Sequence, residues 1–362
     1  MATRRRFFGG LATAGMGWLS PAAALQDGRP VPCRVVDARS GRPVPARVRL
    51  VDARGREVVP VGHPAALPEK AGEGDVRFQS RRYAYVDGSF TLDPAALPVK
   101  YQVLKGYEYT IAEGEIPAAL PSGQPFTIPL SRWSDLNSRG WHSGDIHIHH
   151  IAPSTCRLEM EAEDLNVANI LTSDFTVDQE RFEGKLNLHS GPGRLIYVSQ
   201  EFRNDQLGHL CLLNLKKLVE PVKPIRHEHF PLLIDACEET RRQGGYVSFA
   251  HFPSLPGVES PLDVAFGKMD GLEILSVQDP RTFAHSPRWK EIVPEMAVNH
   301  GLLLWYRYLN CGFRLTATAG TDKMTTFVTV GANRVYARLE GDFTYQGWID
   351  ALKAGRTFIS NS

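Results

Sequence analysis

The sequence predicts an α/β barrel preceded by a small antiparallel β-sandwich. Residues 30–132 read as short strands and turns with frequent proline, whereas residues 140–362 alternate compact apolar runs with helical patterns. A chain of 362 residues is long enough for two such domains. Alternating strand and helix units imply a parallel sheet, and their number predicts a closed or nearly closed barrel.

The first 26 residues predict an export signal. The run RRRFF at 4–8 is followed by an apolar, Gly- and Ala-rich stretch to Leu19 and then by PAAA at 21–24. A charged region, an apolar region and small residues in this order are typical of export signals, and paired arginines before phenylalanine resemble a twin-arginine signal. The alternative is a disordered basic N-terminus. We therefore expect a periplasmic or extracellular protein.

The sandwich region shows strand alternation and turn residues. Residues 46–50 alternate as a half-buried strand does, and the pairs at 40–41, 54–55 and 87–88 each place Gly where a hairpin turn needs it. Residues 90–92 and 107–111 fit further strands. A valine-rich strand followed by SGRPVP and later by DGSFTL resembles the carboxypeptidase-regulatory-like, transthyretin-type β-domain.

The barrel region contains compact apolar runs that predict strands. They lie at 145–148, 170–171, 195–198, 209–215, 246–250, 271–275 and 315–319, and TFIS near the C-terminus has the same texture. Helical spacing appears at 158–165, at 232–237 with a stop at Gly244-Gly245, and from about Trp289 to Leu309.

The heptapeptide GDIHIHH at 144–150 places histidines within a predicted strand. His147 and His149 are two positions apart, so both side chains point to one face, which Asp145 shares. Two imidazoles that converge at a strand end are natural ligands for a divalent metal. The alternative is a pair of histidines satisfied by hydrogen bonds.

Four further polar residues lie near the ends of other predicted strands. Glu201 and His251 each follow an apolar run, Asp322 follows the run at 315–319, and His209 opens a strand. Because a site in a barrel forms at the carboxyl ends of the strands, the loop before His209 is expected to fold back over the barrel mouth. Four His, one Glu and one Asp exceed what one tetrahedral zinc needs. They predict two divalent ions bridged by a carboxylate.

The region from GWHSGDIHIHH to WIDALKAGRTFISNS resembles the PHP (polymerase and histidinol phosphatase) superfamily, most of all its carbaryl-hydrolase-like branch. The resemblance implies a distorted (β/α)7 barrel, zinc, manganese or iron as metals, and hydrolysis of phosphoester, amide or ester bonds. It also implies the role of each candidate ligand. His147 and His149 form the first metal motif, Glu201 is the bridging carboxylate, and the remaining ligands are His209, His251 and Asp322.

The sequence departs from the family pattern at two positions. Where the family reads Thr-Asp-His-Asn, this chain has Asp174 in place of the histidine, and Lys323 and Met324 follow Asp322 where a final histidine is usual. We therefore expect at most two metals. Asp174 is expected to act as a ligand or proton carrier. Lys323 is expected to orient an anionic substrate or stabilise an oxyanion, the alternative being a solvated surface lysine.

Several other polar residues near these motifs have weaker interpretations. Asp145 is expected to orient an imidazole rather than bind metal, and Glu273 is either a similar supporting residue or a barrel-end polar residue. Cys211 is expected to pack in the core. The triplet His227-Glu228-His229 is expected to be a solvated loop, and His142 and His150 are weaker ligand candidates.

Composition limits the partners. The net charge is +1 with no basic stripe beyond the first residues, and no apolar run approaches the ~20 residues that span a bilayer. We therefore expect a small-molecule or polymer-derived substrate, no nucleic acid and no membrane span, and the oligomeric state is left open. The predicted function is metal-assisted hydrolysis. The alternative is an exported binding protein that has kept the metal pocket but lost turnover.

Overall fold

The computed structural model describes residues 29–63, 73–78, 81–121, 123–173, 181–252, 259–276 and 300–361. The predicted export signal and Asp174 lie outside these ranges, as does the first part of the helix expected from Trp289. The described residues form three sheets, of three, five and nine strands.

Two of the sheets form the N-terminal part of the chain. The three-stranded sheet has the order β5-β1-β8 and the five-stranded sheet the order β3-β4-β2-β6-β7. Their strands are β1 (Val31–Asp37), β2 (Ala46–Asp52), β3 (Val76–Phe78), β4 (Arg81–Val86), β5 (Ser89–Leu92), β6 (Val99–Leu104), β7 (Ala112–Ile116) and β8 (Phe126–Leu130). The residues from both sheets that form one buried core include Val35, Val48, Leu92, Val103 and Ile128.

The elements of this part follow the expected alternation, with one exception. Along β2, every second residue from Ala46 to Asp52 is buried. The strand expected at 107–111 is wrong, because Gly106 has a φ of 53° and the chain turns there before β7 begins at Ala112. Short 3-10 helices cover Pro94–Ala96 and Asn137–Arg139.

The nine-stranded sheet curves into a nearly closed barrel. Its order is β15-β14-β13-β12-β11-β10-β9-β16-β17. Its strands are β9 (Trp141–Ile148), β10 (Val167–Thr172), β11 (Leu195–Asn204), β12 (Gly208–Leu213), β13 (Tyr246–Phe249), β14 (Gly271–Leu275), β15 (Thr316–Ala319), β16 (Arg334–Arg338) and β17 (Thr357–Ser360). The two outer strands approach each other, since Thr357 Oγ1 of β17 donates to Ala317 O of β15 at 3.4 Å.

The barrel is sheet-rich and mixed, so the expected (β/α)7 pattern is not clearly present. β12 pairs antiparallel with both β11 and β13, and β16 pairs antiparallel with β9 and β17. β11 ends at Asn204 and β12 begins at Gly208. A parallel crossover needs a dozen or more residues, so this short connection forces an antiparallel return without a helix.

The described helices pack on the outside of the barrel. They are α1 (Pro153–Ala162), α3 (Leu233–Arg242), α4 (Ser260–Ala265), α7 (His300–Asn310) and α8 (Tyr345–Lys353). Trp348 of α8 is fully buried against Gly144 of β9, where an added Cβ would overlap the indole ring. Among the described residues, no helix is long and apolar enough to cross a bilayer.

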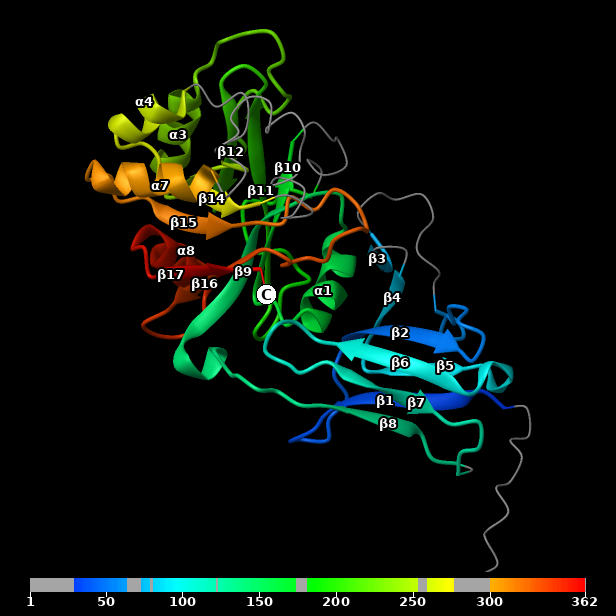
Figure 1. Ribbon diagram of the computed structural model, residues 1–362. Coiled ribbons are helices and arrows are strands. Elements are labelled where there is room, and N and C mark those ends of the chain that lie inside the picture. Colours follow the sequence, from blue (N-terminus) through cyan, green and yellow to red (C-terminus); the bar gives the residue numbers. More distant parts are fainter. Residues whose placement is uncertain are drawn as a thin grey trace, which may run out of the picture.

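The sandwich and the barrel meet beside α1, which lies between them (Figure 1). Glu163, just after α1, pairs with Arg47 Nε at 2.6 Å and accepts from Tyr85 Oη at 3.0 Å. Tyr107 Oη donates to Ala332 O at 2.5 Å. Buried, charge-assisted contacts of this kind hold the two parts in a defined orientation.

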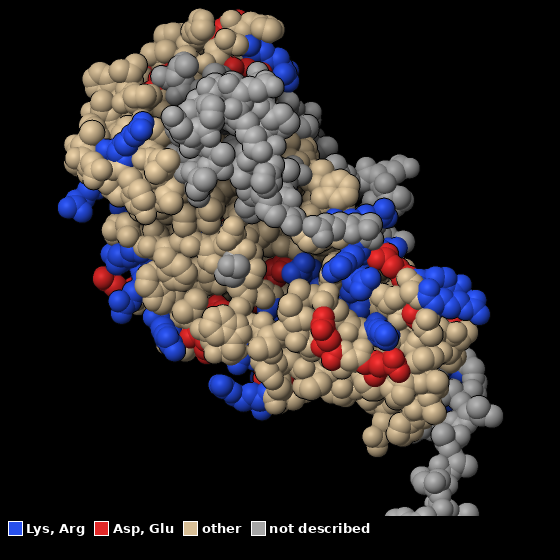
Figure 2. Space-filling view, viewed as in Figure 1, with Lys and Arg blue, Asp and Glu red and all other residues tan. Residues whose placement is uncertain are grey.

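The surface carries both signs of charge. Figure 2 shows acidic and basic side chains close together on one face of the described residues. The net charge of +1 therefore results from many charges that balance.

Candidate metal centre

β9 presents two histidines to one point inside the barrel. His147 and His149 alternate onto the same face, both are buried, and their Nε2 atoms lie 3.0 Å apart. Their Nδ1 atoms already have partners. His149 Nδ1 lies 2.7 Å from Leu171 O, and His147 Nδ1 lies 3.1 Å from Glu273 Oε2. Such contacts fix the ring orientation and leave Nε2 of each ring available as a ligand atom.

Glu201 and Asp322 bring carboxylates to the two imidazoles. Glu201 Oε2 lies 3.3 Å from His149 Nε2, and Asp322 Oδ1 lies 3.6 Å from His147 Nε2. One ligand atom from each of His147, His149 and Asp322 lies within 4.8 Å of the other two, so these residues could hold one metal ion. We call these three residues the inner group.

The other oxygen of Glu201 faces a second pair of histidines. Glu201 Oε1 lies 3.1 Å from His209 Nδ1 and 3.4 Å from His251 Nε2, and these two nitrogens are 3.3 Å apart. Glu201, His209 and His251 form a further possible metal group. We call the two histidines the outer group. One carboxylate thus lies between two sets of ligands, as in a centre that binds two ions.

Strand direction explains how His209 reaches the centre. β12 runs antiparallel to β11, with Arg203 opposite His209 and Glu201 opposite Cys211. The start of β12 therefore already lies at the same end as the end of β11. The expectation that the loop before His209 folds back over the barrel mouth is wrong. Glu201 lies within β11 rather than beyond its end.

Two of the six candidate ligands have an unusual backbone. His251 has a φ of 35° and Asp322 a φ of 47°, in the left-handed region that non-glycine residues seldom adopt. His251 is held by its N–H, which donates to Glu273 Oε2 at 2.5 Å. A strained backbone conformation of this kind persists only where the surrounding structure holds it in place, and such residues cluster at functional sites.

Asp145 supports the turn that carries Asp322. Asp145 Oδ1 accepts from His147 N at 3.0 Å and Thr321 N at 2.9 Å, and Oδ2 accepts from Thr321 Oγ1 and from Gly331 N at 2.8 Å. It bonds to backbone and hydroxyl groups. The expectation that it orients an imidazole is therefore wrong. Glu273 has that role.

Gly320 leaves room for the buried supporting residues. A Cβ placed there would lie 2.5 Å from His147 Cβ and would overlap the carboxylate of Glu273. Any side chain at this position would displace one of these two groups. The glycine before Thr321 and Asp322 therefore permits the close approach of this loop to β9.

Electrostatics keep Glu201 ionised. Burial alone would raise its pKa, but hydrogen bonds to His149, His209 and His251 hold the pKa well below its usual value. The pKa of Glu273 is likewise lowered, because His147 outweighs the effect of burial. Burial opposes charge on His147, yet Cys211, Glu273 and Asp322 raise its pKa well above the usual value. The centre therefore strongly favours positive charge at this point.

The donor set fits divalent metals of intermediate softness. Four imidazoles and two carboxylates converge, and ions such as zinc, manganese or iron accept mixtures of nitrogen and oxygen ligands. A third possible group combines His147, Cys211 and Glu273, all fully buried. It shares the imidazole of the inner group, with Cys211 Sγ 3.4 Å from His147 Nδ1. Cys211 is therefore a neighbour of the centre as well as a core residue.

Lys323 does not occupy the position expected of it. Its side chain is fully buried, and Nζ donates to Val328 O at 2.8 Å and Thr325 O at 3.0 Å, with Glu159 Oε2 at 3.8 Å. Its backbone carbonyl accepts from His149 N at 2.9 Å. This geometry contradicts the solvated alternative. Two of the three ammonium N–H donors bind the backbone carbonyls of Thr325 and Val328 and not the centre. The expected oxyanion role therefore does not fit.

The weaker histidine candidates do not belong to any of the possible metal groups among the described residues. His142 stacks on Phe343 with ring centroids 4.2 Å apart, and the ring centroid of His150 lies 6.0 Å from that of His149. Residues 227–229 are exposed in an irregular connection. Asp174 lies outside the described residues.

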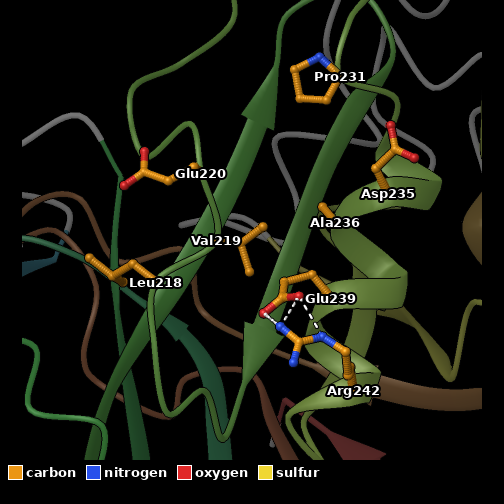
Figure 3. Close-up of a pocket in the computed structure, with 8 residues that line it drawn as sticks. All are labelled: Leu218, Val219, Glu220, Pro231, Asp235, Ala236, Glu239 and Arg242. Carbon is orange, nitrogen blue, oxygen red and sulfur yellow. Dashed lines mark hydrogen bonds and ion pairs between the residues drawn. The ribbon is translucent and has the colours of Figure 1, made fainter.

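A separate hollow lies away from this chemistry. A cavity of about 380 Å³ opens between α3 and the preceding loop, and its lining includes Val219, Asp235, Glu239 and Arg242 (Figure 3). Arg242 donates three hydrogen bonds of 2.5, 2.7 and 2.9 Å to the carboxylate of Glu239. None of the six candidate ligands lines this cavity.

Comparisons with known proteins give structural resemblance only. No family model matches the chain, and no curated protein matches its sequence. PsfC from Pseudomonas syringae PB-5123 aligns with a TM-score of 0.37 and 16% identity, over 58% of this chain and 88% of that chain. The lesion-specific endonuclease PfuEndoQ from Pyrococcus furiosus aligns with a TM-score of 0.37 and 13% identity, over 60% of this chain and 57% of that chain.

An endonuclease Q complex with a 27-mer duplex carrying an abasic lesion aligns with a TM-score of 0.34 and 12% identity, over 59% of this chain and 57% of that chain. The aligned region thus spans little more than half the length of either endonuclease chain. At these values the alignments carry no argument about activity. They do correct one expectation: nucleic acid was excluded from composition alone, yet structures that resemble this chain are endonucleases, one of them bound to duplex DNA.

Proposed function

We propose that this protein is a metal-dependent hydrolase whose centre holds two divalent ions. The observation that carries the proposal is the position of Glu201 between the two groups. Its Oε2 lies 3.3 Å from His149 of the inner group, and its Oε1 lies 3.1 Å from His209 of the outer group and 3.7 Å from His147 Nε2. The inner ion would be held by His147, His149, Asp322 and Glu201, and the outer ion by Glu201, His209 and His251. Two ions held in this way would lower the pKa of a bound water and would polarise the carbonyl or phosphoryl oxygen under attack.

The residues of the chain supply the preorganisation that such chemistry needs. Glu201 remains a carboxylate because three imidazoles contact it. Glu273 fixes the ring of His147 and the backbone of His251 together. Ligands locked by such contacts need no rearrangement when substrate binds. We retain Asp174 as the proposed proton carrier.

We infer that the chain belongs with the PHP superfamily and its carbaryl-hydrolase-like branch, and that the N-terminal sandwich is a carboxypeptidase-regulatory-like domain. The motifs around His147, Glu201, His251 and Asp322 support the first inference, and SGRPVP and DGSFTL support the second. We further propose twin-arginine export, which the run RRRFF supports. The cleaved bond is then a phosphoester, an ester or an amide or carbamate.

The test combines metal analysis with a substrate panel. Protein purified without chelator is analysed for bound metal and assayed with 4-nitrophenyl phosphate, bis(4-nitrophenyl) phosphate, 4-nitrophenyl acetate and a nitrophenyl carbamate. The matched pair of variants is Glu201→Gln in the centre and Glu239→Gln in the surface ion pair with Arg242. We expect about two equivalents of metal and turnover that E201Q abolishes and E239Q retains. Bound metal without turnover would favour a binding protein, and absence of metal would refute the proposal.

A further inference from the structure

Arg203 lies at the mouth of the proposed metal centre. It follows Glu201 by two positions on β11, so both side chains point to the same face of the sheet. It is also opposite His209 in the ladder between β11 and β12. Its Nε lies 3.8 Å from Glu201 Oε2, and 26% of its side chain is exposed.

The guanidinium of Arg203 has unused hydrogen-bonding capacity. Its Nε is buried and has no hydrogen-bond partner among the described residues. A buried donor without a partner costs about 1–3 kcal/mol. Asp205, an acid just beyond the end of this strand, lies 3.6 Å from Arg226 Nη1 and 3.6 Å from His209 Nε2. Nothing else in the described part of the chain neutralises Arg203 except the carboxylate of Glu201, which also faces the histidines.

Charge balance indicates what Arg203 is for. Four neutral imidazoles, the carboxylates of Glu201 and Asp322, and the Glu273 carboxylate that contacts His147 would carry a charge of −3, whereas two divalent ions would carry +4. Arg203 adds a further positive charge to a centre that already has an excess. A cation in this place is stabilised only when an anion joins it.

We propose that Arg203 is an anion-binding residue of this centre, so that the accepted substrate carries a negatively charged oxygen at or beside the cleaved bond. The planar guanidinium presents paired donors that match phosphoryl and carboxylate oxygens. The proposal rests on the proposed function and makes it more specific. The competing interpretation is that Arg203 only holds Glu201 in place, in which case its loss would release metal.

The experiment measures binding of inorganic phosphate to the full-length protein as purified, by calorimetry, with the metal content of each sample determined in parallel. The variants are Arg203→Met, which keeps length without charge, and Arg203→Lys. The control is Arg226→Met, which removes a nearby positive charge that lies 3.6 Å from Asp205. Acetate is titrated in the same way, to distinguish phosphoryl from carboxylate recognition.

We expect phosphate affinity to fall at least tenfold in R203M and by less in R203K, with metal content unchanged in both and affinity unchanged in R226M. Equal affinity in R203M and wild type would overturn the proposal, as would loss of metal from R203M or absence of phosphate binding to the wild type. The substrate panel separates the two claims. Phosphate binding that depends on Arg203 without turnover of any substrate refutes the hydrolase and retains the anion site. If 4-nitrophenyl acetate, a neutral ester, is turned over and R203M binds phosphate as tightly as wild type, the hydrolase is retained and the anion site at Arg203 is refuted.

Discussion

The inner and outer groups of the centre differ in how firmly the chain holds them. His147 and His149 are fully buried on one strand, and a carbonyl or carboxylate contacts the second nitrogen of each ring. The side chains of His209 and His251 are each 14% exposed and come from two different strand ends. The two histidines of the inner group are therefore set by the fold itself, whereas the two outer histidines depend on Glu201 and on the strained backbone at His251. Asp322, the third member of the inner group, is 21% exposed and has a strained backbone of the same kind as His251.

This difference predicts unequal metal affinity. Ligands that are already oriented lose less conformational freedom when an ion binds. We expect the inner group to load first and to retain its ion longer during dialysis against chelator. The outer ion would then be the exchangeable one, and it lies nearer to the exposed side of the centre.

The largest effect is expected from Glu201→Gln, because this residue serves both groups. The loss of charge should lower metal content at both positions. Replacing a residue that only orients a ligand typically reduces activity by up to about 10²-fold, and E201Q should reduce it by more. Metal content by elemental analysis and kcat on the best panel substrate are the readouts. Retention of two equivalents of metal in E201Q would show that Glu201 does not bridge.

A pair of alanine variants separates the two groups. His147→Ala removes a buried ring and should cost about 2 kcal/mol or more of folding stability together with the inner ion. His209→Ala should cost under about 1 kcal/mol and release only the outer ion. Thermal unfolding and metal analysis on both proteins test this contrast. Equal losses of stability in the two variants would contradict the difference between the groups.

Glu273→Gln tests the support beneath the inner group. The amide keeps the shape but removes the charge that contacts His147 Nδ1, so metal affinity should fall about 10–100-fold. The variant should remain folded, and excess metal in the assay should restore activity. Chelator competition gives the affinity, and Glu239→Gln serves as the control. An unchanged affinity would mean that Glu273 is merely a polar residue of the barrel.

The smallest effect is expected at a buried acid outside both groups. Burial, and then Glu259, raise the pKa of Asp263 from 3.8 to about 8. Because the folded-state pKa is the higher one, the stabilising contribution is complete below the unfolded pKa and is lost as the pH rises through about 8. Asp263→Asn should therefore raise Tm relative to wild type above that pH and change it little in acid.

Thermal unfolding across this pH range, with the exposed Asp350→Asn as control, measures the effect of Asp263. It also provides the background against which pH effects on the metal centre are judged. If D263N and wild type showed parallel Tm profiles, Asp263 would not titrate in this range.

The inner group was the easier part to predict from sequence. Alternation along a strand places His147 and His149 on one face without further information. The connection of Asp205–Leu207 is equally readable, since it is too short for a helix and implies an antiparallel β12. The short connection before β12 would therefore have predicted that His209 lies at the barrel mouth.

The supporting residues could not be predicted in the same way. Glu273 meets His147 across the barrel, and such contacts depend on how the sheet curves rather than on spacing. Lys323 follows Asp322, whose φ of 47° no residue pattern predicts, and its Nζ contacts with Thr325 O and Val328 O depend on the course of that loop. The buried role of Asp145 likewise requires the loop that carries Thr321 and Gly331.

The most direct test is a crystal structure of protein purified without chelator, with anomalous data collected at the absorption edges of the metals found by elemental analysis. The proposal predicts two anomalous peaks, one on each side of the Glu201 carboxylate. One peak should contact His147, His149 and Asp322, and the other His209 and His251. A map without peaks at these positions, or with a single ion bound away from Glu201, would contradict a two-metal centre.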